Sequence, residues 1–469
     1  MEPFMDDDPK HSCGIVAMAL SSDAVPDLRR ALRVIQHRGQ ESAGIAVFNG
    51  KINSLRDMGL VHEVMRGPEY EALHGNLGIG HVRYSTSGAS CVQNCQPIIV
   101  TTIAGDVALG HNGDLVNSAK LRAKLQKEGW AFLTTSDSEI IIRILANELK
   151  QTKDPVKAIR STLRNLEGSF SLVIMIGDRV YGARDSLGFH PLCVGTLRNG
   201  YCIASESAVF DVLQGEFIRD IMPGEIVEIT KDEFTSHKVA GPPHRAHCMF
   251  EWVYFARPDS IIEGREVYDV RKKLGQVLAR EQPAVADVVI PVPDSGRANA
   301  LGYAQESGIT YEEGLMKNRY VERTFIMPEQ SQREESVGLK LNPILSTVKG
   351  KRVVVVDDSI VRGTTLRKIV QMLRRAGAKE VHVRIGCPPI IAPCYYGIDM
   401  RTREQFAATG RTFEQIAEML TADSVGYTSL EGLEEALGMP DEDICLACLT
   451  SEYPTCVPGE KMRFQKTLI

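Results

Sequence analysis

The sequence predicts a chain of mixed α/β and α+β character that folds as two domains. Its 469 residues exceed what one hydrophobic core usually holds. In the first half, β-rich runs alternate with helical patterns, and in the second half a strand–loop–helix–strand order predicts a parallel sheet. A polar, proline-rich segment around residue 241, GPPHRAHC, predicts the linker between the domains.

Hydrophobic periodicity predicts the elements of the first half. The apolar runs 14–20 and 170–176 are β-rich and bounded by Gly or polar residues, which predicts strands. Apolar residues within 28–35 recur at i, i+4 and i+7, and a second stripe covers 141–149. Both stripes predict amphipathic helices.

The second half has the rhythm of a parallel α/β sheet. Buried strands are predicted at 287–292, 352–358 and 381–385, with a helix at 366–378 between the last two. The first strand ends at a Pro-Asp-Ser-Gly turn and the second at two aspartates. Loops at the carboxyl ends of such strands are where ligands bind.

Composition limits the partners of the chain. Apolar residues make up 43% and charged residues 24%, as in ordinary globular proteins. The net charge of -6 gives no bulk attraction to nucleic acid or to an anionic membrane, so neither is an expected partner. No apolar run reaches the roughly 18 residues of a membrane span, and residues 1–12 lack the apolar core of a secretory signal. A cytoplasmic location is expected, where the 11 cysteines would be free, catalytic or metal-bound.

The most informative stretch is VVVVDDSIVRGTT at 353–365. A predicted strand delivers Asp357 and Asp358 to the sheet edge, Gly363 allows close backbone approach, and a helix N-terminus that attracts anions follows. Hydroxyl groups are supplied by Ser359, Thr364 and Thr365. Such a set suits sugar hydroxyls, or a Mg2+ ion bridging to pyrophosphate. The alternative is an acidic turn followed by a Ser/Thr helix cap.

This arrangement resembles the signature of the phosphoribosyltransferases, which bind 5-phosphoribosyl pyrophosphate. The resemblance implies that Asp357 and Asp358 hold the ribose hydroxyls. Residues 359–365, Arg362 included, would hold the 5'-phosphate. Asp294, in PVPDSG, would lie near the pyrophosphate and share the Mg2+ ion with the other two carboxylates. A plain Pro-Asp turn is the alternative for this residue.

Five motifs of the first half resemble the glutaminase domain of amidotransferases that use an N-terminal nucleophile. In order, they are CGIVA at Cys13, HRGQES (37–42), GHVRYSTSG (80–88), HNGDL (111–115) and TSDSE (135–139). The resemblance implies an αββα sandwich. From 13 to 460 the chain resembles the glutamine phosphoribosylpyrophosphate amidotransferases, or amidophosphoribosyltransferases, of the iron–sulfur-containing, propeptide-bearing type. The implied parts are a propeptide (1–12), a glutaminase domain (13–240) and a phosphoribosyltransferase domain with a C-terminal cluster-binding segment (241–469).

The same resemblance assigns roles to single residues. Cys13 would attack the side-chain amide of glutamine, with its own α-amino group, of pKa near ~8, as the base. Asn112 and the N–H of the glycine after it would form the oxyanion hole. Arg83 would pair with the carboxylate of glutamine, and Asp137 would accept from its α-amino group. Arg38, in the family's mobile glutamine loop, would help to close the site.

Taken singly, these motifs have structural alternatives. Asn112-Gly113 alone is an ordinary hairpin turn. The pattern at 136–139 alone is a helix capping box, with Asp137 a solvated charge. Cys13 alone is more often a small buried hydrophobe than a nucleophile.

Cys445 and Cys448 form a CxxC, which alone predicts a redox pair or half of a zinc site. The family resemblance adds Cys248, ahead of FARPDS, and Cys394, in PCYYGID, and implies one 4Fe-4S cluster on four thiolates. The cluster would be structural, because neither half-reaction transfers electrons. Cys387 is close in sequence to Cys394 but is not an implied ligand.

The resemblance also implies the reaction. Glutamine and phosphoribosyl pyrophosphate would be the substrates, and ammonia would pass between the two sites to give 5-phosphoribosylamine, the first committed step of de novo purine biosynthesis. Purine nucleotides would be feedback inhibitors, and the chain would form a homodimer or homotetramer. Residues 1–12 would have to be removed, because an amide nitrogen at Cys13 cannot take the thiol proton.

A polar segment at 317–342 is the implied lid over the second site. Its basic residues are Arg319, Arg323, Arg333 and Lys340. Gly338, in this lid, stands where relatives commonly have a basic residue. His190, in LGFHPL, stands where relatives commonly have Arg. These departures put one phosphate contact and one local ion pair in doubt.

Three other functions are consistent with parts of the sequence. Another glutamine amidotransferase would have a different acceptor, against which the phosphate loop argues. A regulator that only senses phosphoribosyl pyrophosphate would not need Arg83, Asn112 and Asp137 together with Cys13. An iron–sulfur redox protein would need none of the phosphate-binding residues.

Overall fold

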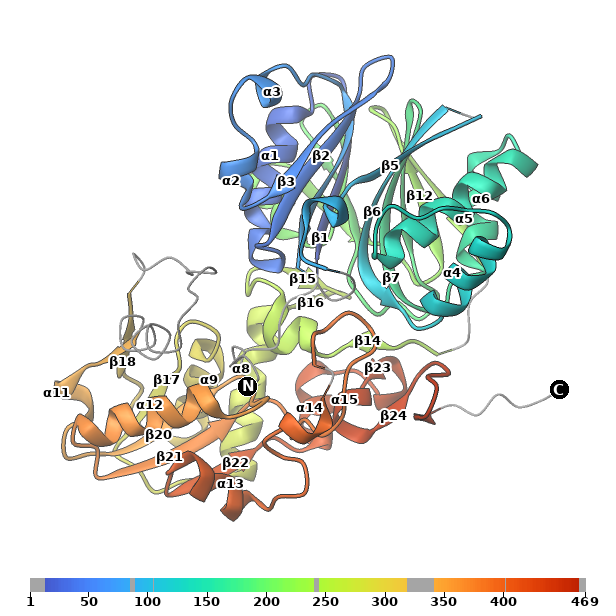
Figure 1. Ribbon diagram of the computed structural model, residues 1–469. Coiled ribbons are helices and arrows are strands. Elements are labelled where there is room, and N and C mark those ends of the chain that lie inside the picture. Colours follow the sequence, from blue (N-terminus) through green and yellow to red (C-terminus); the bar gives the residue numbers. More distant parts are fainter. Residues whose placement is uncertain are drawn as a thin grey trace.

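The structure is a computed structural model and describes residues 13–84, 89–103, 105–239, 244–318, 341–400 and 402–463. Figure 1 shows two domains, with residues 13–239 above and residues 244–463 below. Three predicted features lie outside the described residues: the propeptide (1–12), the boundary at 240 and 241, and the lid from 319 to 340 with its four basic residues and Gly338. No helix of the described ranges is long and apolar enough to cross a membrane.

Two antiparallel sheets pack face to face in the upper domain. Their strand orders are β11-β9-β10-β1-β4-β2-β3 and β13-β12-β8-β7-β6-β5. The first contains β1 (Gly14–Leu20), β2 (Ser42–Phe48), β3 (Ile52–Met58), β4 (Leu77–Arg83), β9 (Cys193–Leu197), β10 (Gly200–Ala204) and β11 (Glu216–Asp220). The second contains β5 (Ile98–Thr102), β6 (Gly105–Leu115), β7 (Gly168–Ile176), β8 (Arg179–Arg184), β12 (Glu225–Ile229) and β13 (Phe234–Lys238).

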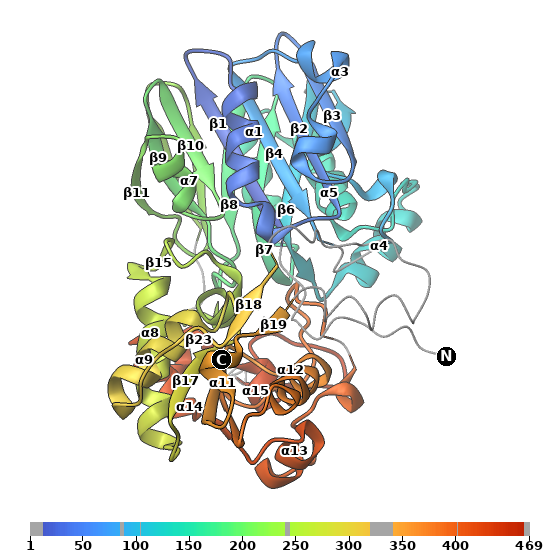
Figure 2. The ribbon, with the colours of Figure 1, turned by 90° about the vertical axis from the view of Figure 1, so that its left-hand side faces the viewer.

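Helices cover the outer faces of both sheets. The first sheet carries α1 (Val25–Val34), α2 (Val61–Val64), α3 (Pro68–Glu71) and α7 (Ala208–Val212), and the second carries α4 (Ser118–Lys127), α5 (Asp137–Gln151) and α6 (Pro155–Leu163). Strand alternation makes this possible: in β1, Val16 and Met18 face the helices, whereas Ile15 and Ala17 face the other sheet. Figure 2 shows α1 lying across β1 and β4. The predicted αββα sandwich is confirmed.

The lower domain contains a parallel sheet of order β17-β20-β21-β22. Its strands are β17 (Val288–Pro291), β20 (Arg352–Asp357), β21 (Glu380–Ile385) and β22 (Ser424–Tyr427). In β20, Val354 and Val356 pack toward α9, whereas Val353 and Val355 pack toward α12. The surrounding helices are α8 (Val267–Glu281) and α9 (Arg297–Ser307) on one face, α12 (Thr364–Arg375) and α13 (Phe413–Leu420) on the other, and α14 (Leu430–Leu437) against α8.

Short elements join the two domains. Strand β14 (His247–Cys248) pairs in parallel with β23 (Ile444–Cys445), and the π-helical turn η3 (Glu251–Phe255) follows β14. The N–H of Cys248 donates to the carbonyl of Phe189 at 2.9 Å, so the chain entering the lower domain stays bound to the upper one.

The other short elements include η1 (Gln36–Arg38), η2 (Val92–Asn94), β15 (Ile261–Ile262), β16 (Arg265–Glu266), β18 (Leu315–Lys317), β19 (Leu341–Pro343), α11 (Leu345–Val348), η4 (Arg403–Gln405), η5 (Asp441–Asp443), α15 (Ala447–Thr450), β24 (Glu452–Tyr453) and β25 (Lys461–Met462).

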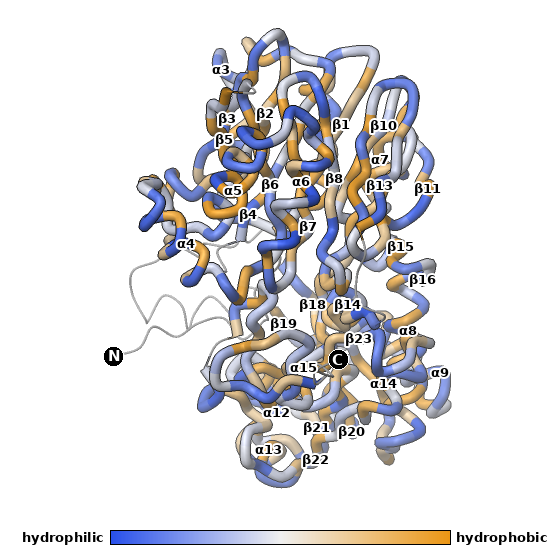
Figure 3. The backbone as a smooth tube through the Cα atoms, turned by 90° about the vertical axis from the view of Figure 1, so that its right-hand side faces the viewer, coloured by the Kyte–Doolittle hydropathy of each residue, from blue (hydrophilic) through white to orange (hydrophobic). Residues whose placement is uncertain are grey.

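The elements predicted from periodicity are confirmed. The five strands are β1, β7, β17, β20 and β21, and the three helices are α1, α5 and α12. Figure 3 shows the reason, with hydrophobic stretches along the central strands and alternating stretches along the helices.

Candidate active sites

Cys13 is buried and directly precedes β1. The residue is 7% exposed, and its Sγ donates to the carbonyl oxygen of Tyr84 at 3.5 Å. Burial is the main cause that raises the pKa of the thiol, to about 11 in total. The charges of Glu41 and Asp137 add to the rise, and the charge of Arg83 opposes it. Because the thiol is protonated at neutral pH, it needs a base before it can act as a nucleophile.

Asn112 and Gly113 lie inside β6, opposite Ser171 and Phe170 of β7, so the hairpin-turn alternative is wrong. Asn112 is fully buried, and neither its Nδ2 nor its Oδ1 has a hydrogen-bond partner among the described residues. Buried amides normally find partners, so this one is available to a ligand atom. Gly113 has a φ of 146°, and a Cβ there would lie 2.1 Å from the carbonyl oxygen of Ser169, so only glycine fits.

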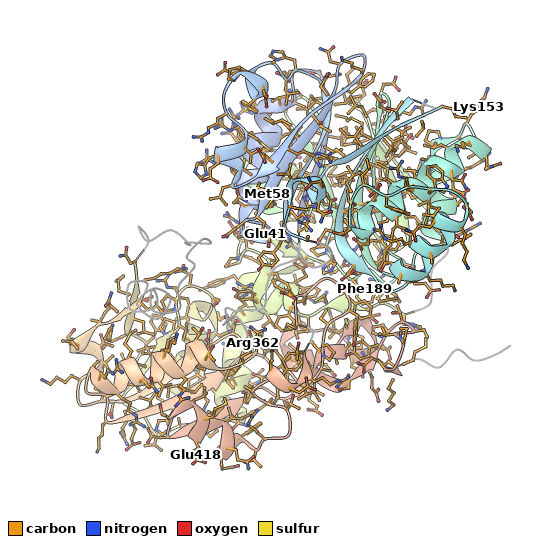
Figure 4. The ribbon with its side chains drawn as sticks, in the orientation of Figure 1. Glu41, Met58, Lys153, Phe189, Arg362 and Glu418 are labelled. Atoms are coloured by element: carbon orange, nitrogen blue, oxygen red, sulfur yellow. The ribbon has the colours of Figure 1, made fainter. Side chains whose placement is uncertain are left out.

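Arg83 and Asp137 both act electrostatically on the Cys13 thiol, which places the three in one site. Arg83, at the end of β4, is 2% exposed, and its Nη1 lies 3.9 Å from Glu41 Oε2. Figure 4 shows Glu41 near the edge of the upper domain that faces the lower one. The site therefore lies at the edge of the upper domain that faces the lower one.

Asp137 begins α5 but is 4% exposed, so the alternative of a solvated charge is wrong. Its Oδ2 accepts from the N–H of Leu115 at 3.1 Å, and its Oδ1 lies 3.7 Å from His111 Nδ1. Asp137 thus contacts β6 on both sides of Asn112, at His111 and at Leu115. Glu139 turns back to accept from the preceding loop, so the capping box does not form.

Arg38 was predicted to help to close the glutamine site. The residue lies in η1 and is fully buried, and its guanidinium is held in place by fixed partners. Its Nε donates to the carbonyl oxygen of Cys13 at 3.2 Å, and its Nη1 donates to Glu206 Oε1 at 2.7 Å. Its Nη2 donates to both carboxylate oxygens of Glu251, at 2.7 and 3.0 Å. Arg38 therefore holds the backbone of Cys13, and its part in closing the site over glutamine stays a prediction.

Two buried residues that hold Arg38 beside Cys13, Glu206 and Glu251, were not predicted from the sequence. His190 Nδ1 lies 3.0 Å from Glu251 Oε1, so an ion-pair partner is present where the departure from arginine had put one in doubt. The only local signal for Glu251 was an acid inside the apolar run MFEWVYFA. A buried acid is uncommon unless it is paired.

The predicted phosphate loop follows β20. Asp358 is 4% exposed, receives the Ser359 hydroxyl at 2.7 Å and donates its N–H to Asp357 Oδ1 at 2.9 Å. Burial raises the pKa of Asp358, and hydrogen bonds from Ser295 and Ser359 oppose the rise. The side chain therefore gains from a cation or from hydroxyl donors.

Gly363 precedes α12 with a φ of 85°, the left-handed conformation that glycine adopts without strain. This turn directs the first N–H groups of α12, from Thr364 and Thr365 onward, toward the loop. Arg362 Nε donates to Gln405 Oε1 at 3.0 Å. The loop can thus offer backbone N–H groups and hydroxyls to a phosphate.

Asp294 follows β17, the neighbour of β20, and the adjacent Ser295 reaches Asp358. The carboxylate of Asp294 binds Arg297 at 2.7 Å and Lys317 at 2.9 Å. In the described part of the chain no three His, Cys, Asp or Glu side chains converge on one metal position. The Mg2+ site at Asp294, Asp357 and Asp358 stays a prediction. Asp357 and Asp358 still fit Mg2+, which commonly takes one or two carboxylates, water and substrate phosphates.

The four cysteines implied as cluster ligands lie close together. Cys248 and Cys445 are register partners between β14 and β23. Burial raises the pKa of Cys445 to about 12, and the Cys394 thiol adds to the rise. Burial likewise raises the pKa of Cys448, and the thiols of Cys394, Cys445, Cys387 and Cys248 add to the rise. All eleven cysteines lie in described residues, and none forms a disulfide.

This donor set fits an iron–sulfur cluster better than a single ion. The thiolates of such a cluster bind separate iron atoms, so they need not converge on one point. Cys387 is fully buried and donates its N–H to the carbonyl oxygen of Asp358 at 2.8 Å, which ties it to the phosphate loop. Cys193 and Cys202 are buried in the first sheet, as ordinary core thiols are.

The turn η3 lies between the two candidate sites. At its start, Glu251 binds Arg38 next to Cys13. On its other side, Arg271 of α8 donates to the carbonyl oxygen of Trp252 at 2.7 Å, and its charge lowers the pKa of Asp358. Figure 4 shows Arg362, from the phosphate loop, on the part of the lower domain that faces the upper one. The sites are therefore neighbours across the domain interface.

Two family models match the chain. The glutamine amidotransferase domain matches residues 81–212, and the phosphoribosyl transferase domain matches residues 261–387. The first range includes Arg83, Asn112 and Asp137, and the second includes the phosphate loop.

Relatives cover nearly the whole length of the chain. It is 53% identical to an amidophosphoribosyltransferase of Archaeoglobus fulgidus, over 96% of this chain and 99% of that protein. It is 52% identical to the one from Methanocaldococcus jannaschii, over 92% and 94%. The solved structure of glutamine phosphoribosylpyrophosphate amidotransferase from B. subtilis, complexed with ADP and GMP, superposes with a TM-score of 0.88 at 40% identity, covering 97% of this chain and 99% of that one.

Proposed function

The chain belongs to the amidophosphoribosyltransferase family, and we propose that its two neighbouring sites carry out the two half-reactions of that enzyme. The family makes 5-phosphoribosylamine from glutamine and phosphoribosyl pyrophosphate, the first step of purine biosynthesis. The observation that carries the assignment of the first site is the buried Asn112 amide, which lacks a partner among the described residues and lies next to Gly113. It gives the site of Cys13, Arg83 and Asp137 an oxyanion hole.

Glutamine hydrolysis begins at Cys13. The thiol attacks the side-chain amide carbon, and the α-amino group freed by removal of residues 1–12 takes the thiol proton. The Asn112 amide and the Gly113 N–H stabilise the oxyanion. The protonated α-amino group then gives its proton to the amide nitrogen as the C–N bond breaks, so ammonia leaves and a thioester remains. Water releases glutamate from the thioester. Arg83 holds the carboxylate of the substrate, and Asp137 accepts from its α-amino group.

The second half-reaction takes place at the phosphate loop. Asp357 and Asp358 accept hydrogen bonds from the ribose hydroxyls, and the residues from Ser359 to Thr365 bind the 5'-phosphate. Ammonia forms a bond to C1 of the ribosyl group as the bond to pyrophosphate breaks. Mg2+ held by these two aspartates and the substrate would neutralise the leaving pyrophosphate.

Ammonia passes between the sites along the interface that contains η3. The support is the position of this turn, which contacts Arg38 on one side and Arg271 on the other. Water would protonate free ammonia, so the path must exclude bulk solvent.

Purine nucleotides inhibit the enzyme, and the chain forms a homodimer or homotetramer. Inhibition by GMP and sedimentation of the purified enzyme test these two statements.

Processing at Cys13 has a measurable signature. In a chain that retains residues 1–12, the Cys13 thiol with a pKa of about 11 is about 0.01% thiolate at pH 7. Its alkylation rate should therefore rise about tenfold per pH unit up to about pH 11. A chain that begins at Cys13 should hydrolyse glutamine at neutral pH. The N-terminal mass shows whether residues 1–12 have been removed. Peptide mass spectrometry after alkylation gives the rate at which the Cys13 thiol reacts. Glutaminase activity in an unprocessed chain would contradict the proposal.

The cluster ligands are Cys248, Cys394, Cys445 and Cys448. The support is their family positions and their close approach at the β14–β23 pair. Because the buried thiols have raised pKa values, binding a cluster must release protons. The bound cluster would fix three separate chain segments in the lower domain and supply no electron to either half-reaction.

Iron content tests this ligand set. The enzyme isolated without oxygen should contain about four iron and four sulfide atoms per chain. Cys445→Ser should lower both close to zero, whereas Cys202→Ser, at another buried thiol, should not. Iron that survives Cys445→Ser at the wild-type level would contradict the assignment.

A further inference from the structure

Four buried charged or chargeable residues form one connected group at the domain interface. Arg38 binds Glu206 and Glu251, and Glu251 in turn contacts His190. The side chains of Arg38, Glu206 and His190 are fully buried, and that of Glu251 is 1% exposed. We refer to these residues as the Arg38 network. It contacts the nucleophile directly, because Arg38 Nε donates to the carbonyl oxygen of Cys13 at 3.2 Å.

The network contains two carboxylates and one permanent positive charge. Two carboxylates share one buried guanidinium, and an uncompensated buried charge is strongly unfavourable. His37 also contacts Glu206, at 2.7 Å, but its side chain is 29% exposed and serves only that end. His190 is the residue placed to balance Glu251.

The geometry at His190 supports its protonation. Its Nδ1 lies 3.0 Å from the Glu251 carboxylate, and its Nε2 lies 2.6 Å from the carbonyl oxygen of Tyr396. Both of these partners can only accept hydrogen bonds, and an imidazole donates from both nitrogens only in its charged form. The other titratable groups near the ring are Asp185 and His111, while Arg184 donates to the backbone carbonyl of His190 at 2.7 Å.

The Nε2 atom of His190 lies on the side of the ring that faces the proposed oxyanion hole. The carbonyl oxygen of Tyr396 also accepts from the Ser169 hydroxyl at 2.7 Å. A Cβ added to the next residue, Gly397, would lie 3.1 Å from His190 Nε2 and 3.4 Å from Gly113 Cα. The segment that His190 anchors is therefore packed directly against the backbone of Gly113.

We propose that His190, as an imidazolium, is a positioning residue for glutamine hydrolysis. It orients the Cys13 backbone through Glu251 and Arg38, and it sets the Gly113 backbone through Tyr396 and Gly397. The two halves of the reaction centre, nucleophile and oxyanion hole, are thus aligned by one buried cation. This inference rests on the proposed roles of Cys13 and Gly113.

The test compares His190→Gln with wild type in four assays on the full enzyme: glutamine-dependent synthesis, ammonia-dependent synthesis, the KM for glutamine and the rate of Cys13 alkylation. We expect kcat with glutamine and the alkylation rate to fall roughly ten- to a hundredfold, because small displacements of reacting groups have effects of this size. The KM for glutamine and ammonia-dependent synthesis should stay within about twofold of wild type. His190→Arg keeps the charge and two separate donors, so it should restore kcat.

His382→Gln is the matched control. His382 also contacts a hydroxyl and a carboxylate, Ser424 at 2.9 Å and Glu380 at 3.2 Å, but it lies on β21, away from Cys13. It should leave all four assays unchanged. Cys13→Ala in the same series tests the premise: if that variant keeps glutaminase activity, the proposed function fails, not only the role of His190.

Two results would overturn the inference. One is a His190→Gln enzyme with wild-type kcat for glutamine. The other is a parallel loss of glutamine-dependent and ammonia-dependent synthesis, which marks a merely structural residue. If His190→Gln does not fold, His190→Arg decides in the same four assays. Its kcat for glutamine should stay close to the wild-type value, and a tenfold or larger fall would reject the role of the charge at His190.

Discussion

Replacing Cys13 by alanine should abolish glutamine-dependent synthesis and leave ammonia-dependent synthesis largely intact. The variant removes the nucleophile, so kcat with glutamine should fall at least about 10⁴-fold, as in other enzymes that lose a nucleophile. The phosphate loop lies in the other domain and needs only ammonia. The measurement is formation of 5-phosphoribosylamine from each nitrogen source.

Cys202→Ala is the matched control for this experiment. Cys202 is also fully buried, and it lies opposite Met18 of β1 in the same sheet as Cys13. Loss of its thiol should cost stability without changing either activity by more than about twofold. Equal, mild effects of Cys13→Ala and Cys202→Ala would mean that Cys13 is an ordinary core thiol.

Replacing Asp358 by alanine should have the complementary effect. Hydrogen bonds to a charged carboxylate contribute about 1.5–3 kcal/mol each, and two ribose hydroxyls depend on the Asp357–Asp358 pair. The kcat/KM for phosphoribosyl pyrophosphate should therefore fall roughly 10²–10⁴-fold with either nitrogen source. Alkylation of Cys13 should continue at the wild-type rate, because the glutaminase site is intact.

Asp287→Asn is the control for that variant. Asp287 binds Arg352 at 2.6 Å at the amino end of β20, whereas Asp358 follows the carboxyl end. Ligands bind beyond the carboxyl ends of parallel strands, so Asp287→Asn should leave synthesis unchanged. If Asp358→Ala keeps its kcat/KM for the ribosyl substrate, the ribose site lies elsewhere.

Local sequence predicted most of the fold and the residues that meet substrate. Strands such as β1 and β20 are apolar runs bounded by polar residues, and burial of both faces favours them wherever they pack. Asp357 and Asp358 were recognisable because strand, acidic pair, glycine and helix follow one another directly. Such features depend on neighbours in the chain, which a sequence displays.

The supporting residues were not predictable, because their partners are distant. Arg38 meets Glu206 across 168 positions and Glu251 across 213. The capping box at 136–139 also failed to form. A contact across 26 positions buries Asp137 beside His111, whereas Glu139 accepts from the nearby N–H groups of Leu133 and Thr134, a local alternative that competes with the capping box.

The parallel pairing of β14 with β23 also constrains the order in which the enzyme is completed. The pair joins Cys248 to Cys445, about 200 residues later in the chain. A ribosome adds about 5–20 residues per second, so the upper domain emerges tens of seconds before these contacts can form. During that interval Gly397 does not yet pack against Gly113, so the glutaminase site lacks one of its packing contacts. The contact between Gly397 and Gly113 therefore forms only after most of the lower domain has been made.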